Sequence, residues 1–181
     1  MESGRMFIGL GGNVGNRLEN LVRARSMMRG AWGEPVGVSA VYETPAWGMA
    51  PGTPAFLNQV LAFVSPVDVP PESVLDFLLD VEVELGRFRS ADAVGYENRT
   101  VDLDLLLLEG REERHVSARL EVPHPRMAER RFVLEPLAEI APEVRVAGQH
   151  ATVAELLARC ADEARLTRFG LTHEPWAKTD A

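Results

Sequence analysis

The apolar positions of the first 110 residues predict four strands and two helices. Short apolar or alternating runs, typical of strands, lie at 6–10, 35–44, 56–64 and 101–108. Between them, apolar residues recur at helical spacing over about 18–30 and again over 70–86. The second helix begins with two prolines and a glutamate, residues that favour a helix start. The predicted order of elements is therefore β-α-β-β-α-β.

This order is typical of α+β proteins with a ferredoxin-like fold. We expect an antiparallel sheet with both helices packed on one face. No stretch of linker composition divides the chain, so residues 1–181 are expected to form a single domain with a core over 1–110.

The rest of the chain predicts a C-terminal elaboration over 111–171 that packs on the same core. Apolar spacing there indicates two short helices, over 132–140 and 152–160, and a further strand within 165–171. Residues 172–181 are expected to form a loose tail.

Composition and charge exclude some classes of function. Hydrophobic residues make up 46% of the 181 positions, charged residues 25%, and the net charge is −8. This balance disfavours a polybasic membrane protein and a protein that binds nucleic acid over its whole surface. The single cysteine, Cys160, and the lack of a long apolar run near the N-terminus favour a cytoplasmic location.

The basic residues are unusual, because 18 of the 19 are arginines and only Lys178 is a lysine. One interpretation of this excess of arginine is codon bias. The functional interpretation is that several arginines bind anions in a bidentate manner, which lysine cannot do. Composition alone does not separate the two.

Two aspartates, Asp102 and Asp104, stand two positions apart in the most apolar predicted strand. Side chains at i and i+2 share one face of a strand, so both carboxylates point away from the layer of Val101 and Leu103. Like charges in apolar surroundings repel each other and lose hydration, and a divalent cation such as Mg²⁺ compensates for both effects. The alternative is a solvated edge on which Arg99 is an ion-pair partner.

Two arginine-bearing segments flank this strand. Arg87, Arg89 and Arg99 precede it, and guanidinium groups beside a carboxylate pair suit a phosphate chain. The second segment, 119–132, contains four arginines and a histidine held between two prolines. The alternative for the first segment is a solvated loop, and the alternative for the second is a structural turn.

A third group of residues suits a flat heterocycle. Asn58, in the strand over 56–64, has an amide with both a donor and acceptors, while Phe56 and Trp47 could stack on a ring. The alternative for Trp47 is that it covers the core. The glycine-rich segment 9–15 fits neither a dinucleotide fingerprint nor a phosphate-binding loop, so a tight strand-to-helix turn explains it.

Taken in order, these motifs resemble the 6-hydroxymethyl-7,8-dihydropterin pyrophosphokinase (HPPK) family over about residues 7–143. The resemblance rests on four segments, Gly9-Leu10-Gly11-Gly12-Asn13, Tyr42-Glu43-Thr44-Pro45 with Phe56-Leu57-Asn58, Arg99-Thr100-Val101-Asp102-Leu103-Asp104, and Val122-Pro123-His124-Pro125 with Arg130 and Phe132. It implies a ferredoxin-like fold and an enzyme of folate biosynthesis that transfers pyrophosphate from ATP to the hydroxymethyl group of the pterin, releasing AMP.

The resemblance also implies roles for residues. Asp102 and Asp104 would bind two Mg²⁺ ions and, with Arg87 and Arg99, form the catalytic group. The ATP site would contain Glu82, Arg87, Arg89, Arg99, Arg119, His124 and Arg130. The pterin site would contain Thr44, Pro45, Trp47, Phe56, Asn58 and Phe132. The implied partners are these small molecules, with no nucleic acid and no membrane, and 181 residues leave no room for a second catalytic domain.

Two other functions remain open on the residues alone. One is another two-metal nucleotidyl or phosphoryl transferase on a ferredoxin-like core, which would bind nucleotide without pterin. The other is a non-catalytic ferredoxin-like ligand-binding module, which would not need the aspartate pair.

Overall fold

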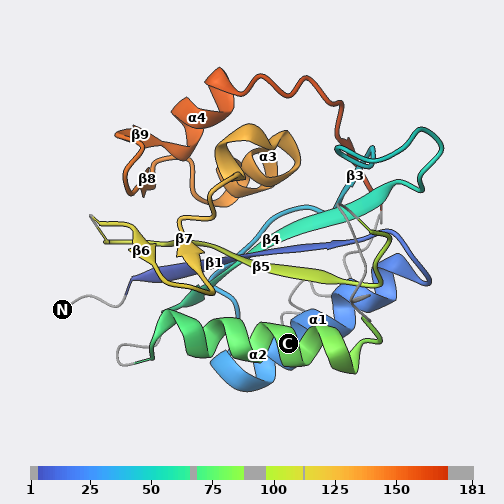
Figure 1. The fold of residues 1–181 in the computed structure, drawn as a ribbon, viewed down its shortest axis with the longest axis horizontal. Coiled ribbons are helices and arrows are strands. Elements are labelled where there is room, and N and C mark those ends of the chain that lie inside the picture. Colours follow the sequence, from blue (N-terminus) through green and yellow to red (C-terminus); the bar gives the residue numbers. More distant parts are fainter. Residues whose placement is uncertain (1–3, 66–68, 88–96, 112, 171–181) are drawn as a thin grey trace, which may run out of the picture.

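The computed structural model describes residues 4–65, 69–87, 97–111 and 113–170. Its centre is an antiparallel sheet in the order β10-β3-β4-β1-β5, with β2 also paired to β4 (Figure 1). The first 110 residues contribute β1 (Arg5–Gly12), α1 (Arg17–Trp32), β2 (Gly37–Val38), β3 (Tyr42–Thr44), β4 (Phe56–Val64), α2 (Pro71–Glu84) and β5 (Asp102–Leu108). The ferredoxin-like arrangement is confirmed, because β5, β1, β4 and β3 lie side by side in that order.

The remaining elements are short and build on the same sheet. They are β6 (His115–Val116), β7 (Glu121–Val122), the 3-10 turn η1 (Met127–Glu129), α3 (Arg131–Ile140), β8 (Arg145–Val146), β9 (Ala151–Thr152), α4 (Val153–Arg159) and β10 (Thr167–Arg168). The β6–β7 and β8–β9 hairpins have no counterpart among the predicted elements. In the part of the chain that the structure describes, none of the helices has the length and apolar character needed to cross a membrane.

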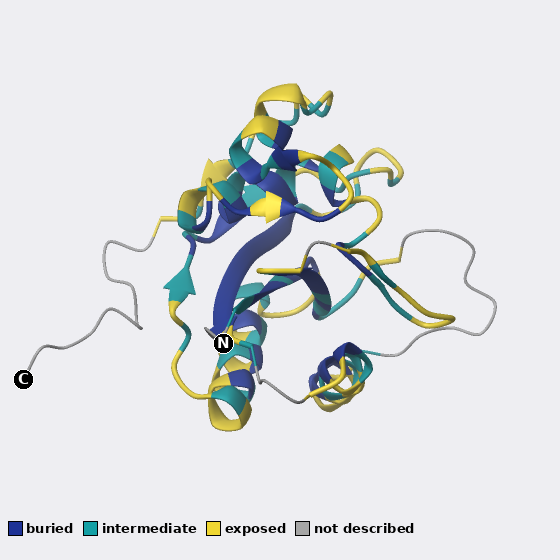
Figure 2. Ribbon diagram, turned by 90° about the vertical axis from the view of Figure 1, so that its left-hand side faces the viewer, coloured by how far each residue is buried: buried dark blue, intermediate teal, exposed yellow. Residues whose placement is uncertain are grey.

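The elaboration packs differently from the prediction. Helices α1 and α2 cover one face of the sheet, whereas α3 and α4 cover the other and build a second apolar cluster there (Figure 1). The central strands are buried over most of their length, as their dark blue colour in Figure 2 shows. The prediction of one shared core was therefore wrong, because continuous apolar strands present buried side chains to both faces.

The strand predicted over 35–44 is interrupted by a β-bulge. Val38 pairs with Leu61 and Tyr42 pairs with Asn58, so four steps along this strand match three along β4. Ser39 stabilises the interruption, since its hydroxyl accepts a hydrogen bond from the Val60 backbone N–H at 2.9 Å.

A second bulge shapes β5. Ile8 pairs with Leu105 and Phe7 with Leu107, which leaves Leu106 as an extra residue. Leu106 and Leu107 therefore both contribute to the cluster beneath α3. Before this bulge, β5 alternates as predicted, with Leu103 buried on the α1–α2 side and the aspartates on the α3 side.

Helix α1 offers a test of the local analysis. Gly30 lies within this helix, and a Cβ there would meet no atom within 4 Å. Gly30→Ala should raise the free energy of unfolding by about 0.5–1 kcal/mol, because alanine has less backbone freedom to lose. Denaturant unfolding measures the change.

Gly33→Ala is the matched control. Its Cβ would also lie in open space, but Gly33 has a φ of +83°, so alanine should lower the stability. A stability loss in both variants would contradict this description of α1.

Candidate active site

Two glycines of β1 form the floor of a cavity beneath α3. Gly11 pairs with Asn58 of β4 on one side and with Asp102 of β5 on the other, while Gly9 pairs with Asp104. The backbones of neighbouring strands lie about 4.8 Å apart, so the backbones at Asn58 and Asp102 are about 10 Å apart across this floor. A Cβ at Gly11 would lie 2.7 Å from the Asn58 side-chain oxygen, and any larger residue would displace that amide.

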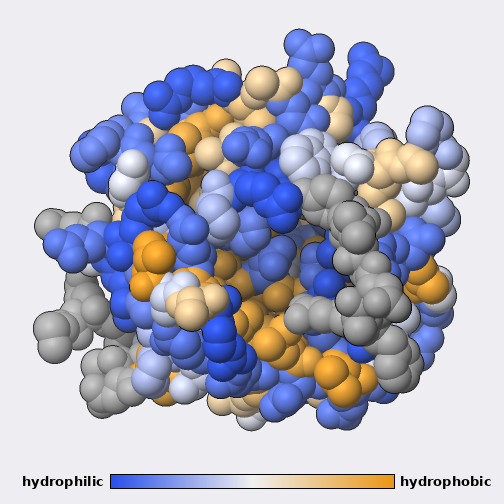
Figure 3. Space-filling view, in the orientation of Figure 1, coloured by the Kyte–Doolittle hydropathy of each residue, from blue (hydrophilic) through white to orange (hydrophobic). Residues whose placement is uncertain are grey.

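The cavity has a volume of about 260 Å³. It opens beneath the α3 layer, in the middle of the face in Figure 3, where hydrophilic and hydrophobic side chains meet. Most of the residues predicted for the site line it: Thr44, Pro45, Trp47, Phe56, Asn58, Arg87, Arg99, Asp102, Asp104, His124, Arg130 and Phe132. The fold therefore brings together segments that are far apart in the sequence.

Two of the predicted residues, Glu82 and Arg119, do not line the cavity. Glu82 is 2% exposed and lies behind the cavity wall, bonded to Arg87. Arg119 lies on the β6–β7 hairpin, which turns toward α2, and it forms an ion pair with Asp76 at 2.5 Å. Arg89 lies outside the described residues.

Asp102 is held by two arginines. Its carboxylate accepts hydrogen bonds from Arg87 and, at 2.9 Å, from Arg99. Arg87 also donates to Glu82 at 2.5 Å, and Glu82 accepts from the Leu103 backbone N–H at 2.8 Å. Burial opposes the charge on Arg87, but Asp102 and Glu82 outweigh it and raise the pKa of that guanidinium. This network fixes both arginines at the edge of the cavity.

Asp104 is a buried carboxylate with a strongly shifted pKa. Burial and the nearby charge of Asp102 raise the pKa of Asp104 to about 7, although Arg130 and Arg99 act in the opposite direction. In the absence of a cation, this side chain is therefore protonated in a large fraction of molecules near neutral pH.

His124 is neutral at pH 7. Burial, together with the charges of Arg130 and Arg126, lowers the pKa of His124 to about 4. Its Nδ1 lies 3.2 Å from the backbone nitrogen of Arg126, whose N–H donates to it. The proton is therefore on Nε2, where a neutral imidazole can donate to an anion.

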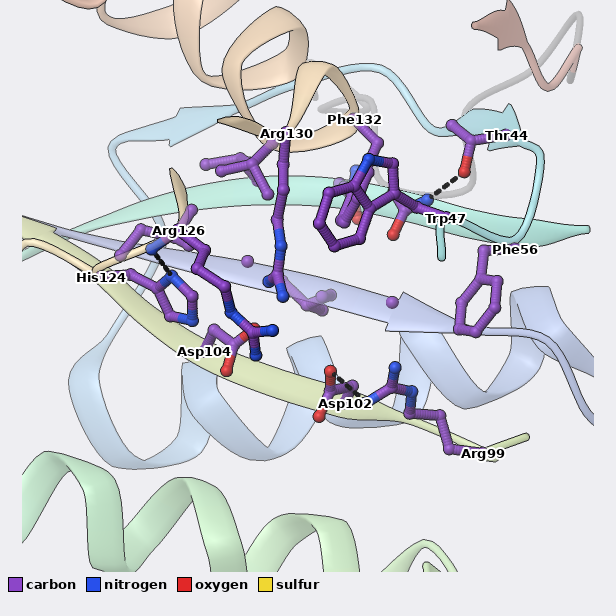
Figure 4. A pocket seen from close by; sticks show the side chains of 18 of the residues that line it. Thr44, Trp47, Phe56, Arg99, Asp102, Asp104, His124, Arg126, Arg130 and Phe132 are labelled. Carbon is purple, nitrogen blue, oxygen red and sulfur yellow. Dashed lines mark hydrogen bonds and ion pairs between the residues drawn. The ribbon is translucent and has the colours of Figure 1, made fainter. Parts of the chain in front are cut away.

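An aromatic wall stands opposite the aspartates. The ring centroids of Trp47 and Phe132 are 6.4 Å apart, and the Arg130 guanidinium lies 5.2 Å and 5.6 Å from them. Figure 4 shows Arg130 extending from the start of α3 toward the sheet, between Trp47 and Asp104. Across the cavity, the Arg99 guanidinium lies 5.5 Å from the centre of the Phe56 ring. Both arginines thus combine an aromatic contact with a position near the carboxylates.

The amide of Asn58 has a fixed orientation. Its Nδ2 donates to the Thr44 hydroxyl at 2.7 Å, the dashed line at Thr44 in Figure 4. Its side-chain oxygen faces Gly11. Asn58 and Thr44 are both buried, so a bound ring meets preorganised polar groups rather than water.

The donor set suits a metal ion that arrives with a phosphate ligand. Within the described ranges, no group of three or more His, Cys, Asp or Glu side chains could hold an ion by protein ligands alone. Asp102 and Asp104 share one face of β5, and Mg²⁺ commonly uses one or two carboxylates together with water and phosphate oxygens. Arg99 supports an anion there, since its buried Nε has no hydrogen-bond partner among the described atoms.

The predicted site residues do not include nine residues that line this cavity: Gly9, Leu10, Gly11, Met49, Gln59, Val60, Leu106, Arg126 and Val133. The two glycines were assigned to a turn, but their alternation within an apolar strand was a usable signal, because strand glycines often mark a close approach. Arg126 was placed in a segment expected to face ATP, but no role was assigned to it.

Comparison with known proteins places the chain in a family. Residues 7–142 match the family model described as 7,8-dihydro-6-hydroxymethylpterin-pyrophosphokinase (HPPK). The chain belongs to the HPPK family. The match covers β1 through α3, and therefore the whole of the cavity described above.

Curated HPPK relatives match over most of their own length. A 2-amino-4-hydroxy-6-hydroxymethyldihydropteridine pyrophosphokinase from Porphyromonas gingivalis is 36% identical, with 76% of this chain and 90% of the relative covered. The enzyme of that name from Pseudomonas aeruginosa is 37% identical, with 86% and 91% covered.

Solved structures show the same fold. A crystal structure of an HPPK-DHPS in complex with substrates superposes with a TM-score of 0.64 at 11% sequence identity, covering 88% of this chain and 43% of that one. The Plasmodium falciparum HPPK-DHPS gives a TM-score of 0.62 at 12% identity, with 87% and 45% covered. This HPPK chain thus spans less than half the length of those proteins.

The raised pKa of Asp104 predicts a pH-dependent stability in metal-free protein. Because the folded pKa of about 7 exceeds the ordinary value of 3.8, stability should fall as the pH rises from about 4 through 7. Asp104→Asn removes the ionisation and should be more stable than wild type at about pH 8, by on the order of 2 kcal/mol.

Chemical unfolding in the presence of a chelator, at about pH 4 and at about pH 8, measures this difference. Asp76→Asn is the control, because Asp76 is an exposed carboxylate in the pair with Arg119. Equal stability of Asp104→Asn and wild type at about pH 4 and at about pH 8 would show that burial does not disfavour the charged form of Asp104.

Proposed function

We propose that this chain transfers the pyrophosphoryl group of ATP to the hydroxymethyl oxygen of 6-hydroxymethyl-7,8-dihydropterin, releasing AMP, as a step of folate biosynthesis. The observation that carries this proposal is the arrangement of two different subsites on one glycine floor. An amide and aromatic rings lie on the β4 side, and carboxylates with arginines lie on the β5 side. The HPPK relatives carry the name of this activity.

The β4 side suits the pterin. Asn58 and Thr44 offer fixed polar groups to the edge of a heterocycle, and Phe56, Trp47 and Phe132 offer ring faces. Stacking between aromatic rings favours a flat ligand over a flexible one. Pro45 lines the cavity next to Thr44.

The β5 side suits the triphosphate. Arg87, Arg99 and Arg130 supply positive charge, and neutral His124 supplies an N–H donor. Asp102 and Asp104 would hold Mg²⁺ ions. When bound with ATP, these ions would neutralise phosphate charge and help to align the reacting oxygens. Glu82 positions Arg87 from behind the cavity.

Transfer requires the pterin hydroxyl oxygen to form a bond with the β-phosphorus while the bond from that phosphorus to the AMP oxygen breaks. Reactions of this kind depend mainly on alignment and on neutralisation of charge. Positioning alone supplies up to about 7–11 kcal/mol of barrier lowering in favourable cases. The floor of Gly9 and Gly11 allows both substrates to approach the same face of β1 closely.

Product analysis tests the proposal directly. Incubation with ATP, Mg²⁺ and the hydroxymethyl-dihydropterin should yield AMP and a pyrophosphorylated pterin in equal amounts, detected by phosphorus NMR and mass spectrometry. ATP binding without any pterin binding in calorimetry would instead favour another nucleotidyl or phosphoryl transferase.

Removal of one carboxylate provides the residue-level prediction. Asp102→Ala should lower kcat by at least about a thousandfold, because it removes a metal ligand and the partner of both arginines. AMP release and circular dichroism are measured in parallel, since the variant is expected to stay folded. Asp76→Ala, which removes an exposed aspartate outside the cavity, should keep near-normal turnover. Near-normal AMP release from Asp102→Ala would refute the metal assignment.

A further inference from the structure

The segment after α4 returns to the sheet and pairs with β3. This strand ends at Thr44, which together with Trp47 and Phe132 forms one side of the proposed pterin site, here called the pterin wall. In Figure 1 the chain leaves α4, crosses beyond α3 and reaches the edge of the sheet beside β3. There Thr167 pairs with Glu43 and Arg168 with Tyr42. This segment lies beyond the residues matched by the family model, which end at 142.

The returning segment is anchored on the α1 side of the sheet. The Phe169 N–H donates to the Val41 carbonyl at 2.8 Å, and its ring packs against the core beneath β3. The Arg17 guanidinium lies 5.9 Å from the centre of that ring and also forms an ion pair with Glu43 at 2.8 Å. β10 is therefore built into the edge of the sheet.

On the α3 side, Glu139 joins three elements. Its carboxylate accepts hydrogen bonds from the Tyr42 hydroxyl at 2.9 Å, from the Ala40 backbone N–H at 3.1 Å and from Arg168 at 3.2 Å. The Arg168 guanidinium also lies 5.9 Å from the centre of the Tyr42 ring. α3, β3 and β10 thus meet at one partly buried carboxylate.

This junction and the pterin wall belong to the same interface between α3 and β3. Glu139 follows Phe132 by seven residues, two helical turns, so both side chains lie on one side of α3, beside the face that is buried on the sheet. Tyr42 precedes Thr44 by two residues, so both lie on one face of β3. A change in separation at Glu139 and Tyr42 would therefore change the separation of Phe132 from Thr44.

We propose that Glu139, Tyr42 and Arg168 form an edge tie that positions the pterin wall, with β10 as its outer support. The inference rests on the proposed function, because it assigns the slot between α3 and β3 to the pterin. The aspartates on β5 lie beyond β4 and β1 in the sheet, and Arg130, at the start of α3, is the one proposed phosphate-binding arginine that lies beside the pterin wall, so the edge tie should affect pterin affinity far more than ATP affinity. Its members are positioning residues, since none of them lines the cavity.

The test compares pterin and nucleotide affinities in variants of the full chain. Glu139→Ala removes three acceptor interactions and should raise the Kd for the pterin about tenfold, while the Kd for a non-hydrolysable ATP analogue with Mg²⁺ stays within about twofold. Glu139→Gln keeps an acceptor oxygen and should recover most of the loss. Arg168→Ala, at an exposed ion pair, should raise the pterin Kd about two- to threefold.

Two control variants give the lower and upper limits for the change in the pterin Kd. Glu135→Ala removes a carboxylate from the same helix, one that accepts from Arg131, and should leave the pterin Kd unchanged. Asn58→Ala removes a direct pterin contact and sets the size of a full loss. Hydrogen exchange of the amides at 41–47 provides a readout independent of ligands, and it should accelerate in Glu139→Ala and Arg168→Ala but not in Glu135→Ala.

The outcomes separate the edge tie from the proposed function. Normal pterin affinity and normal exchange in Arg168→Ala and Glu139→Ala would overturn the edge tie while leaving the proposed function intact. Equal losses of pterin and ATP affinity would also overturn it, since they indicate a general loss of structure. Wild-type protein that binds no pterin, while Asp102→Ala loses ATP binding, would overturn the proposed function itself.

Discussion

The balance of charge around the aspartates of β5 is the constraint on which the rest of the site depends. Glu82, Asp102 and Asp104 bring three carboxylates close to Arg87 and Arg99 at one end of an apolar strand. Two arginines neutralise two carboxylates, and the raised pKa of Asp104 means that the third is protonated in a large fraction of molecules near pH 7 when no cation is bound. The metal-free protein thus avoids a buried excess of negative charge and still keeps a carboxylate available for a metal.

The sheet combines this local balance of charge with the proposed pterin subsite. β1 separates β4 from β5 and presents only glycine at positions 9 and 11. Polar groups on β4 and on β5 therefore face each other across an open floor. Helix α3 covers that floor and supplies Phe132, while the residue before the helix, Arg130, reaches from the aromatic wall toward the carboxylates. The same second layer that buries the upper face of the sheet therefore completes the pocket.

Much of this could be predicted from the sequence where a pattern is local. The alternation of Asp102 and Asp104 with buried leucines follows from the two-residue repeat of a strand, and the order of strands and helices follows from apolar spacing. The bulges at Ser39 and Leu106 could not be predicted, because one extra residue leaves the apolar pattern of a short strand almost unchanged.

The positions of some arginines were the other feature that could not be predicted from the sequence. Arg119 lies only five residues before His124, yet the β6–β7 hairpin carries it to Asp76 on α2, and sequence distance does not report such a turn. Glu82 follows the buried Leu78 by one helical turn, so its burial had a signal in the periodicity of α2. The excess of arginine over lysine acquires a physical meaning at a few positions, such as Arg99 and Arg130, where a planar cation contacts an aromatic ring beside carboxylates.

Proton release on metal–nucleotide binding tests the central claim most directly. Calorimetric titration of metal-free protein with Mg²⁺ and a non-hydrolysable ATP analogue, at about pH 6.5 in buffers of different ionisation enthalpy, measures the number of protons released. The account predicts that wild type releases more protons than Asp104→Asn, because the cation displaces the proton of Asp104. Equal proton release from the two proteins, with both binding the metal–nucleotide complex, would contradict it.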